Sequence, residues 1–286
     1  MSFNIDPNPP VATHHDIYPA IDPTAAFTGK TYTSKTVLVT GASRGIGQII
    51  ALFFAKAGAD VALTARSSLD ETVALIKKSV PDAKILTFAA DVKDASRSEE
   101  VVEQVVKQFG HLDILVANAG TANAMGKLMG DQDANAWWNV VETNVLGVYS
   151  YVRPSLKHLS KTSGYVLILT SVGGIARFAT GSDYLISKHA IIRLAELIAL
   201  EYPSVKAVSI HPGGVLTQLS AGSGMPKETF VDTPELAAGT ALALTSGRFD
   251  WLSPRYIDAS WDLGDIEKLK DAIVAKDALI NKLALP

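Results

Sequence analysis

The sequence predicts a single α/β domain built on a doubly wound parallel sheet flanked by helices. Short apolar runs rich in β-branched residues alternate along the chain with amphipathic segments of helical period. Buried parallel strands have such near-continuous apolar runs, and their alternation with helices is typical of α/β domains. The length of 286 residues fits one domain, because single α/β domains routinely reach roughly 200–250 residues.

The order of these segments predicts a Rossmann-type fold. The six apolar runs expected to form strands are 36–40, 60–65, 84–89, 113–117, 165–170 and 205–210. Helices are expected at 45–57, 69–79, 95–109, about 135–160 and 183–202, and Pro203 ends the last of them. The remaining expected elements are a helix at 234–246, a short strand near 255–259 and a C-terminal helix at about 265–283.

Residues 1–33 are expected to form a proline-rich N-terminal arm in front of a domain that spans 34–286. Five of the 13 prolines fall within the first 23 residues, Pro7 among them. Proline without apolar periodicity predicts irregular or extended backbone. The alternative is that Ile17, Tyr18, Ile21 and Phe27 hold the arm against the domain or against a neighbouring subunit.

Composition excludes several classes of function. A net charge of −3 and a pI near 6.1 give no chain-wide basic field for nucleic acid. The absence of cysteine excludes disulfides, thiolate catalysis and Cys-ligated metals, and His14-His15 lacks partners at metal-ligand spacing. No apolar run approaches the roughly 20 residues of a membrane helix. We therefore expect a cytoplasmic protein with no metal, nucleic-acid or membrane site.

A glycine-rich turn follows the first expected strand and leads into a helix, with the sequence Thr40-Gly41-Ala42-Ser43-Arg44-Gly45-Ile46-Gly47. Glycine permits a tight turn and a close approach of the backbone to a ligand. The helix N-terminus offers free N–H groups and the positive end of a dipole, which suit a pyrophosphate. A turn without any ligand is the alternative.

At this point the chain resembles the short-chain dehydrogenase/reductase family, whose fingerprint is T-G-x-x-x-G-x-G. The resemblance continues in order over about 34–220, through Asp91-Val92, Ala117-Asn118-Ala119-Gly120, Asn144, Ser171, Tyr184-x-x-x-Lys188 and His211-Pro212-Gly213-Gly214-Val215-Leu216-Thr217. Beyond Thr217 it fades. The tail after Ser253 and the pair Trp137-Trp138 look like a group of fungal, often biosynthetic, members.

The resemblance implies a site. Its catalytic set would be Asn144, Ser171, Tyr184 and Lys188. Its cofactor contacts would be Gly41, Ser43, Arg44, Gly45, Ile46 and Gly47 in the turn, Asp91 and Val92 at the adenine, Asn118, Ala119 and Gly120, and then Tyr184, Lys188, Pro212, Gly213, Val215 and Thr217. Family members are commonly dimers or tetramers assembled through two long helices, which implies a homo-oligomer.

The chemistry of the candidate catalytic residues can be argued directly. Tyr184 and Lys188 are four residues apart on an expected helix and share a face. A tyrosine has a pKa of about 10, and a nearby ammonium is expected to lower it towards neutrality. Ser171, at the end of a strand, would donate to a developing alkoxide. Asn144 would support a proton-relaying water, by resemblance.

Cofactor choice depends on the end of the second strand, which has the sequence Thr64-Ala65-Arg66-Ser67. Enzymes that use NAD usually place an acid here, to accept from the ribose 2′-OH. Arg66 can instead pair with a 2′-phosphate, Ser67 can donate to it, and Arg44 offers a second cation. The sequence therefore predicts NADP(H) as the cofactor, with NAD(H) less favoured. The other interpretation is that these arginines are ordinary solvated side chains that bind no phosphate.

Residues 217–232 occupy the place of a substrate loop. Met225 and Phe230 are expected as its apolar contacts, and Arg177 and Phe178 are candidates for the pocket wall. The leading hypothesis is an NADP(H)-dependent ketoreductase that acts on a small carbonyl or alcohol. The alternatives are imine reduction, dehydration or cyclisation with bound NADP(H), and a nucleotide-binding protein without turnover. A serine hydrolase built on Ser171 and His211 is disfavoured, because Leu169 replaces the first glycine of a nucleophile elbow.

Overall fold

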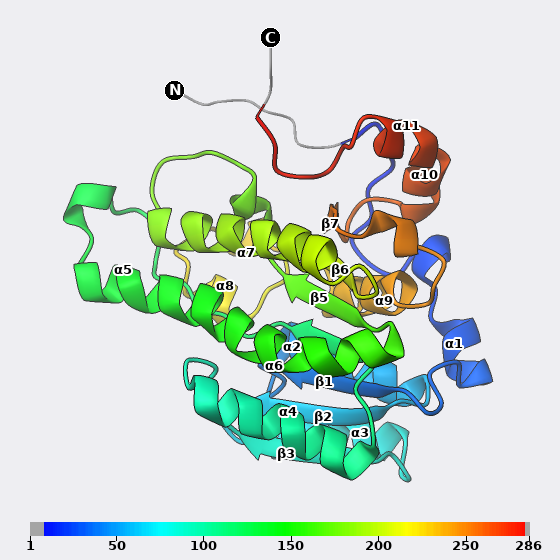
Figure 1. Ribbon diagram of the computed structural model, residues 1–286. Coiled ribbons are helices and arrows are strands. Elements are labelled where there is room, and N and C mark those ends of the chain that lie inside the picture. Colours follow the sequence, from blue (N-terminus) through cyan, green and yellow to red (C-terminus); the bar gives the residue numbers. More distant parts are fainter. Residues whose placement is uncertain (1–8, 284–286) are drawn as a thin grey trace.

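The computed structural model describes residues 9–283, and the strands within them form one parallel sheet with the order β3-β2-β1-β4-β5-β6-β7 (Figure 1). The strands are β1 (Thr36–Thr40), β2 (Asp60–Ala65), β3 (Ile85–Ala89), β4 (Ile114–Ala117), β5 (Tyr165–Leu169), β6 (Lys206–His211) and β7 (Tyr256–Asp258). Every neighbouring pair is parallel. The predicted doubly wound α/β class is confirmed.

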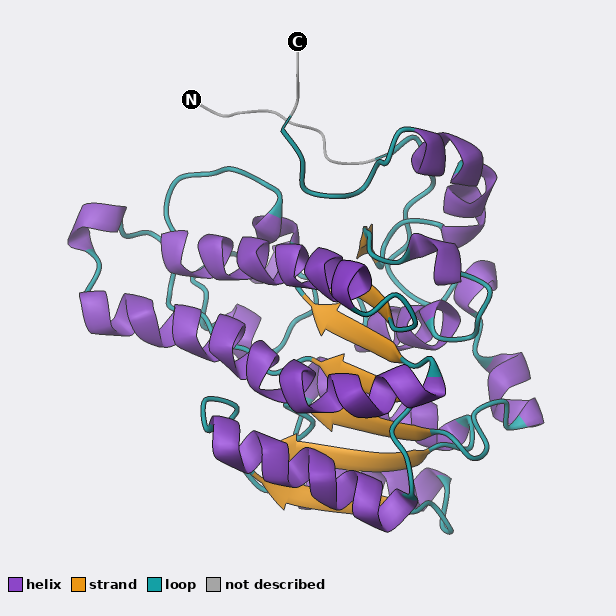
Figure 2. Cartoon of the chain, viewed as in Figure 1, coloured by secondary structure: helices purple, strands orange, loops and turns teal. Residues whose placement is uncertain are grey.

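Helices cover both faces of the sheet (Figure 2). The α-helices are α1 (Thr24–Gly29), α2 (Gly45–Lys56), α3 (Asp70–Ser79), α4 (Ala95–Phe109), α5 (Ala134–Val141), α6 (Gly147–Thr162), α7 (Ser182–Glu201), α8 (Gln218–Ala221), α9 (Pro234–Leu244), α10 (Leu263–Lys268) and α11 (Lys270–Ala275). Shorter 3-10 turns are η1 (Pro19–Ile21), η2 (Met129–Asp131), η4 (Val172–Gly174), η5 (Lys227–Thr229) and η6 (Asp250–Leu252). None of the helices within residues 9–283 is long and apolar enough to cross a membrane.

Two hydrophobic cores lie between the sheet and its helices. In β1, Val37 and Val39 pack on the side of α2, α3 and α9, whereas Leu38 packs on the side of α4, α6 and α7. Since successive side chains of a strand point to opposite faces, a strand covered on both faces must be apolar throughout. This explains the uninterrupted apolar runs in the sequence.

The long helix expected at about 135–160 is interrupted. A π-helical turn at Glu142–Leu146 separates α5 from α6. The buried side chain of Asn144 lies in this turn, where its Oδ1 accepts from the backbone N of Thr121 at 2.8 Å and its Nδ2 donates to Thr121 O at 2.9 Å. These bonds satisfy a buried amide, and we attribute the wide turn to them.

The prediction of one C-terminal helix over 265–283 is wrong. Helices α10 and α11 are short, and the chain after Lys276 is not helical. Asp277 and Leu279 have positive φ angles of 46° and 63°. The backbone here bonds to the domain instead of to itself: Tyr256 N donates to Leu279 O at 2.8 Å, and Asn281 N donates to the Glu196 carboxylate at 2.8 Å. Tertiary hydrogen bonds have replaced those of a helix.

The described part of the N-terminal arm packs against the domain, while Pro7 and the rest of residues 1–8 lie outside the described residues. Tyr18 donates its hydroxyl to Trp261 O at 2.7 Å. The Phe27 ring meets Phe53 of α2 edge-on, with 5.2 Å between centroids. Ile17 and Ile21 press on α9 at Gly239, where an added Cβ would lie 2.6 Å from Ile17 Cδ1 and 2.9 Å from Ile21 O. The absence of a side chain at Gly239 allows this approach.

Gly239→Ala is therefore expected to destabilise the fold by up to about 2 kcal/mol, because a clash costing about 1–3 kcal/mol opposes the roughly 1 kcal/mol by which alanine favours a helix. Urea denaturation measures the difference. Gly130→Ala is the control, since a Cβ there meets nothing within 4 Å. A Gly239→Ala midpoint at or above that of the wild type would contradict this packing.

Candidate active site

A cavity of about 1150 Å³ opens at the carboxyl ends of the strands. This edge, beside the β1/β4 switch point, is where open α/β sheets bind ligands. The predicted site residues that line it are Gly41, Ser43, Arg44, Gly45, Ile46, Gly47, Arg66, Ser67, Val92, Asn118, Ala119, Gly120, Ser171, Tyr184, Lys188, Pro212, Gly213, Val215 and Thr217. Asn144 and Asp91 are the predicted residues that do not line it.

The glycine turn is held tightly against the loop that follows β4. Gly41 has φ +65°, and an added Cβ would lie 2.8 Å from the Cα of Ala119. Asn118 donates from Nδ2 to Thr40 O at 2.8 Å and to Gly41 O at 3.1 Å. Only glycine fits at position 41, because the conformation and the contact both exclude a side chain.

Helix α2 points its N-terminus at the cavity and leaves it without a side-chain cap. Its N-cap residue is Arg44, whose side chain makes no capping hydrogen bond. The first N–H groups of a helix have no partner within the helix, and the dipole is positive there. The turn, the uncapped N-terminus and the volume of the cavity fit the pyrophosphate of a dinucleotide.

The rim beside β2 carries the groups expected at a 2′-phosphate. Ser67 donates to the Ser43 hydroxyl at 2.9 Å, which joins the end of β2 to the glycine turn. Arg66 is largely exposed and lies 3.7 Å from the Asp91 carboxylate. The adenine contact expected of Asp91 has no counterpart in the lining, where Ala90 and Val92 form the wall.

Ser171, Tyr184 and Lys188 meet in the inner part of the cavity. Ser171 follows β5, its Oγ accepts from Gly173 N at 3.1 Å, and its hydroxyl lies near enough to the Tyr184 phenol to lower the pKa of that phenol. Lys188 lies one turn after Tyr184 on α7, with its Nζ 5.6 Å from the centre of the tyrosine ring. That Nζ donates to Leu169 O, the last carbonyl of β5, at 2.8 Å.

Burial controls the protonation of these groups. It raises the pKa of the Tyr184 phenol above 10, and the hydrogen bond from Ser171 only partly offsets this. Burial lowers the pKa of the Lys188 ammonium to about 8. The predicted lowering of the Tyr184 pKa is wrong, because desolvation outweighs the stabilisation of the phenolate by Ser171. At neutral pH the phenol keeps its proton and can give it to a substrate oxygen.

Asn144 lies behind the cavity wall. Besides Thr121, its Nδ2 contacts Ser187 Oγ at 2.9 Å, and Ser187 Oγ donates to Tyr184 O at 2.8 Å. A Cβ added at Gly120 would lie 3.1 Å from Asn144 Oδ1 and 3.5 Å from Lys188 Nζ, which places both groups around this residue. Asn144 therefore links the β4 loop to α7.

The loop after β6 closes the far side of the cavity. Thr217 and Ser220 cap α8 reciprocally, with Thr217 N donating to Ser220 Oγ at 2.7 Å and Ser220 N donating to Thr217 Oγ1 at 3.2 Å. Asp232 ends this loop and bonds to Gly214. The sequence offered no local reason to single out Asp232.

The outer cavity carries six large apolar side chains beside polar ones such as Gln218 and Thr229. The apolar side chains that line it are Met125, Phe178, Leu216, Leu219, Met225 and Phe230. Of the candidates named from the sequence, Phe178, Met225 and Phe230 are present and Arg177 is not among the lining residues. Met125 N donates to Ser223 O at 2.8 Å, which joins the β4 loop to the substrate loop. The sequence gave no reason to select Met125, since a lone methionine carries no positional signal.

Two other kinds of site receive no support. A hydrolase would need a hydrogen bond between Ser171 and His211. Within residues 9–283, Ser171 Oγ accepts from Gly173 N and forms no hydrogen bond with His211. Burial lowers the pKa of His211, which keeps its ring neutral at pH 7. In the same described range, no group of three or more His, Asp or Glu side chains could hold a metal.

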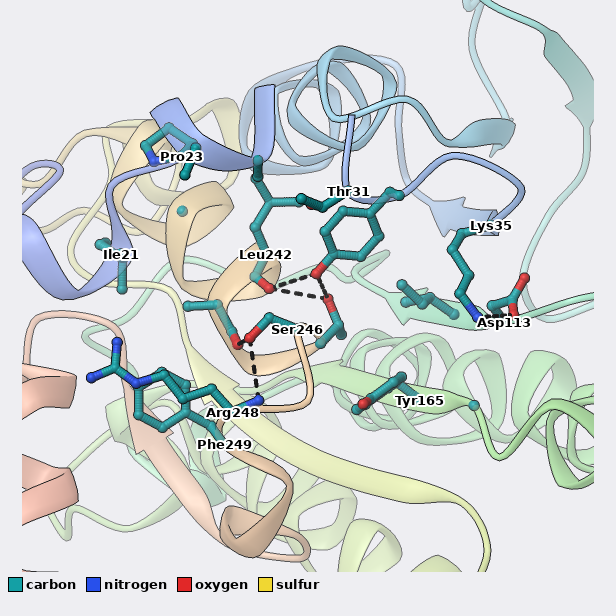
Figure 3. A pocket seen from close by; sticks show the side chains of 18 of the residues that line it. Ile21, Pro23, Thr31, Lys35, Asp113, Tyr165, Leu242, Ser246, Arg248 and Phe249 are labelled. Atoms are coloured by element: carbon teal, nitrogen blue, oxygen red, sulfur yellow. Dashed lines mark hydrogen bonds and ion pairs between the residues drawn. The ribbon is translucent and has the colours of Figure 1, made fainter. Parts of the chain in front are cut away.

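A second cavity, of about 540 Å³, lies at the amino ends of the strands, between the arm and α9 (Figure 3). Two of its polar side chains already have partners: Lys35 Nζ donates to Asp113 at 3.0 Å, and Tyr32 donates its hydroxyl to Leu242 O at 2.7 Å. The groups expected of a cofactor site lie at the opposite edge of the sheet. We therefore assign the candidate site to the larger cavity.

Comparison with known proteins identifies the same family. The family model described as short chain dehydrogenase matches residues 35–227. "Short chain dehydrogenase mpl6" of Monascus purpureus is 39% identical over 285 residues, which cover 96% of this chain and 95% of the relative.

Solved structures agree in fold. An alcohol dehydrogenase from Thermococcus sibiricus complexed with 5-hydroxy-NADP has a TM-score of 0.70 at 29% identity, covering 78% of this chain and 95% of that one. A carveol dehydrogenase from Mycobacterium avium in complex with NAD has a TM-score of 0.71 at 24% identity, covering 80% and 97%, and shows the fold alone.

Burial of Lys188 has a measurable consequence for stability. The unfolded lysine holds its proton up to about pH 10.5, whereas the folded one releases it near pH 8, so the wild type gains stability as pH rises between these values. Lys188→Met removes the buried charge. We expect its stability advantage over the wild type to be largest below pH 8 and to shrink by roughly 3 kcal/mol at pH 10.5.

Urea denaturation of both proteins at several pH values tests this expectation. Lys107→Met removes an exposed ammonium from α4, and it separates the effect of burial from that of charge alone. A difference between Lys188→Met and wild type that stays constant with pH would show that Lys188 is not desolvated.

Proposed function

The chain belongs to the short-chain dehydrogenase family, and from this premise we propose that it is an NADP(H)-dependent ketoreductase with Tyr184 as its general acid. The observation that carries the proposal is the contact of Ser171, Tyr184 and Lys188 at the inner end of a cavity that fits a dinucleotide. Dehydrogenases of this family are oxidoreductases. The direction of the reaction and the choice of cofactor are our inference.

The protonation state of Tyr184 supports the reductive direction that we propose. Burial keeps the proton on the Tyr184 phenol at neutral pH, and a group that starts protonated serves as an acid in carbonyl reduction. Bound NADPH would supply the hydride. Ser171 would donate a hydrogen bond to the carbonyl oxygen and orient it towards the phenol. Lys188 would stabilise the phenolate that forms when Tyr184 gives up its proton.

The choice of cofactor follows from charge. Arg66 and Arg44 line the cavity, and β2 ends in Ala65 with Arg66 and Ser67, not an acid, directly after it. A 2′-phosphate would find two guanidinium groups there, together with the hydroxyl of Ser67. Asp91 lies 3.7 Å from Arg66 and would help hold that side chain at the rim.

The substrate would be a neutral and largely apolar carbonyl compound. The outer cavity is lined by Met125, Phe178, Leu216, Leu219, Met225 and Phe230. Such side chains favour apolar or aromatic surface by desolvation and by ring and sulfur contacts. The lining residue Asp232 is already bonded to Gly214 and His15, which leaves it poorly placed to recruit a cationic substrate.

A homo-oligomer and a cytoplasmic location stay predictions. Exposed apolar side chains along α5 to α7 support the first, because apolar patches on helices favour association. These side chains are Trp138, Leu146, Tyr149, Ile186, Leu197 and Leu200.

Tyr184→Phe tests the assignment of the acid. We expect the rate of NADPH oxidation with neutral aryl ketones to fall by about 10²–10⁴-fold, which is the usual contribution of a general acid. NADPH affinity should change less than threefold, since the ring remains. Tyr149→Phe, at an exposed tyrosine on α6, is the control. Unchanged turnover in Tyr184→Phe would reject the mechanism, and product analysis separates ketone reduction from imine reduction, dehydration or cyclisation.

Arg66→Ala and Arg44→Ala test the cofactor. Each is expected to raise the Kd for NADPH about tenfold, because a charge-assisted hydrogen bond contributes roughly 1.5–3 kcal/mol. The Kd for NADH should change less than twofold, as shown by titration of cofactor fluorescence. Arg153→Ala, which removes an exposed guanidinium from α6, is the control. Tighter binding of NADH than of NADPH by the wild type would overturn the NADP(H) assignment and leave the reductase chemistry standing.

A further inference from the structure

Asp232 connects the N-terminal arm to the wall of the cavity. Its Oδ2 accepts from Gly214 N at 2.5 Å, and its backbone N donates to Gly214 O at 3.1 Å. Its Oδ1 lies 2.6 Å from His15 Nδ1. Because an ionised carboxylate only accepts, the imidazole must donate. The carboxylate is only 9% exposed, so one largely buried anion bridges an arm residue and the backbone of the loop after β6.

The arm is anchored firmly enough to act as a support. Thr13 forms an antiparallel bridge with Trp261, and His14 N donates to Ser260 O at 2.7 Å. The next two residues then hold the start of α9: Thr233 N donates to His15 O at 2.9 Å, and Thr233 Oγ1 donates to the Asp16 carboxylate at 2.7 Å. The end of the substrate loop is therefore fixed by residues more than two hundred positions away in the sequence.

The two ends of the substrate loop differ in how they are held. Thr217 and Ser220 fix the first end by local capping. The second end, at Asp232 and Thr233, depends on arm residues that a local turn cannot replace. Gly214 and Val215 line the cavity directly opposite, and Val215 forms a parallel bridge with Asp232. Any movement of Asp232 would thus shift the cavity wall itself.

We propose that His15 and Asp232 are positioning residues, through which the N-terminal arm holds the Gly213–Val215 backbone and the substrate loop in the conformation that binds cofactor. This inference rests on the proposed function, since it takes the cavity bounded by this wall as the binding site of NADPH. Neither residue touches the reacting atoms. Loss of the arm contact lowers the fraction of molecules that are competent to bind, which raises the apparent Kd without changing the bound complex.

His15→Ala and His14→Ala form a matched pair of variants. His14 contacts the carboxylate of Asp262, at the start of α10, at 2.8 Å. Neither His14 nor His15 lines the cavity. Both variants remove a histidine–carboxylate contact from the arm, but only His15 reaches the cavity wall. We expect His15→Ala to raise the KM for NADPH about three- to tenfold with kcat within twofold of wild type. His14→Ala should change neither, whatever its effect on Tm.

Substitutions of Asp232 give a graded test. Asp232→Asn keeps an oxygen that can accept from Gly214 N and an amide that can face the imidazole, so it should retain NADPH affinity within about threefold. Asp232→Ala loses both contacts and should weaken binding more than His15→Ala does. If the role were purely structural, Tm would fall in the His15 and Asp232 variants, but the KM for NADPH would not rise in the order Asp232→Asn, His15→Ala, Asp232→Ala.

Amide hydrogen exchange of the free proteins separates failure of this inference from failure of the proposed function. Faster exchange over residues 213–232 in His15→Ala than in His14→Ala supports the coupling, even if the wild type binds neither NADPH nor NADH. Equal exchange, or an NADPH KM within twofold in both histidine variants, would overturn it. A wild-type protein that binds neither NADPH nor NADH would overturn the proposed function instead.

Discussion

The parallel pairing of β1 with β4 is the constraint on which the rest of the site depends. Val37 pairs with Ile114 and Val39 with Val116. The strand order reverses between β1 and β4, so the loops that follow these two strands turn away from each other. The polar groups exposed by that parting must be satisfied. Asn118 does this by donating to the carbonyls of Thr40 and Gly41, while Thr40 Oγ1 accepts from Asn118 N and Ala119 N. One amide thereby fixes the glycine turn relative to the loop that leads towards the catalytic groups.

The burial of the Lys188 ammonium in the candidate site opposes folding. Lys188 is an ammonium surrounded by the ends of β5 and α7, with Leu169 O as its hydrogen-bond acceptor. Placing the charge there opposes folding, and desolvation also keeps the proton on Tyr184. The two shifts have one origin, desolvation by the surrounding protein. A stable core avoids buried charged groups, and catalytic sites commonly contain them because their chemistry needs shifted pKa values.

The strands and most helices could be predicted because each carries its own periodic pattern. The bounds of β1 and β2 match the apolar runs at 36–40 and 60–65. Features set by distant partners could not be predicted: the π-turn needs Thr121 opposite Asn144, and the tail needs Glu196 to accept from Asn281 N. The candidate catalytic residues were selected by spacing and family resemblance, and their roles stay predictions. The direction of the Tyr184 pKa shift was missed, since spacing reveals a neighbouring charge but not how much water remains around it.

The C-terminal tail also determines how the sheet ends. Strand β7 lies at one margin of the sheet, where unpaired N–H and C=O groups would invite pairing with another chain. The hydrogen bond from Tyr256 N to Leu279 O covers part of that margin, and the positive φ angles of Asp277 and Leu279 keep the covering segment from running on as a regular strand. The tail therefore acts as a terminator of β-pairing. Pairing of β7 with a strand of another copy is therefore blocked where the tail covers it, while β3 is the opposite margin of the sheet.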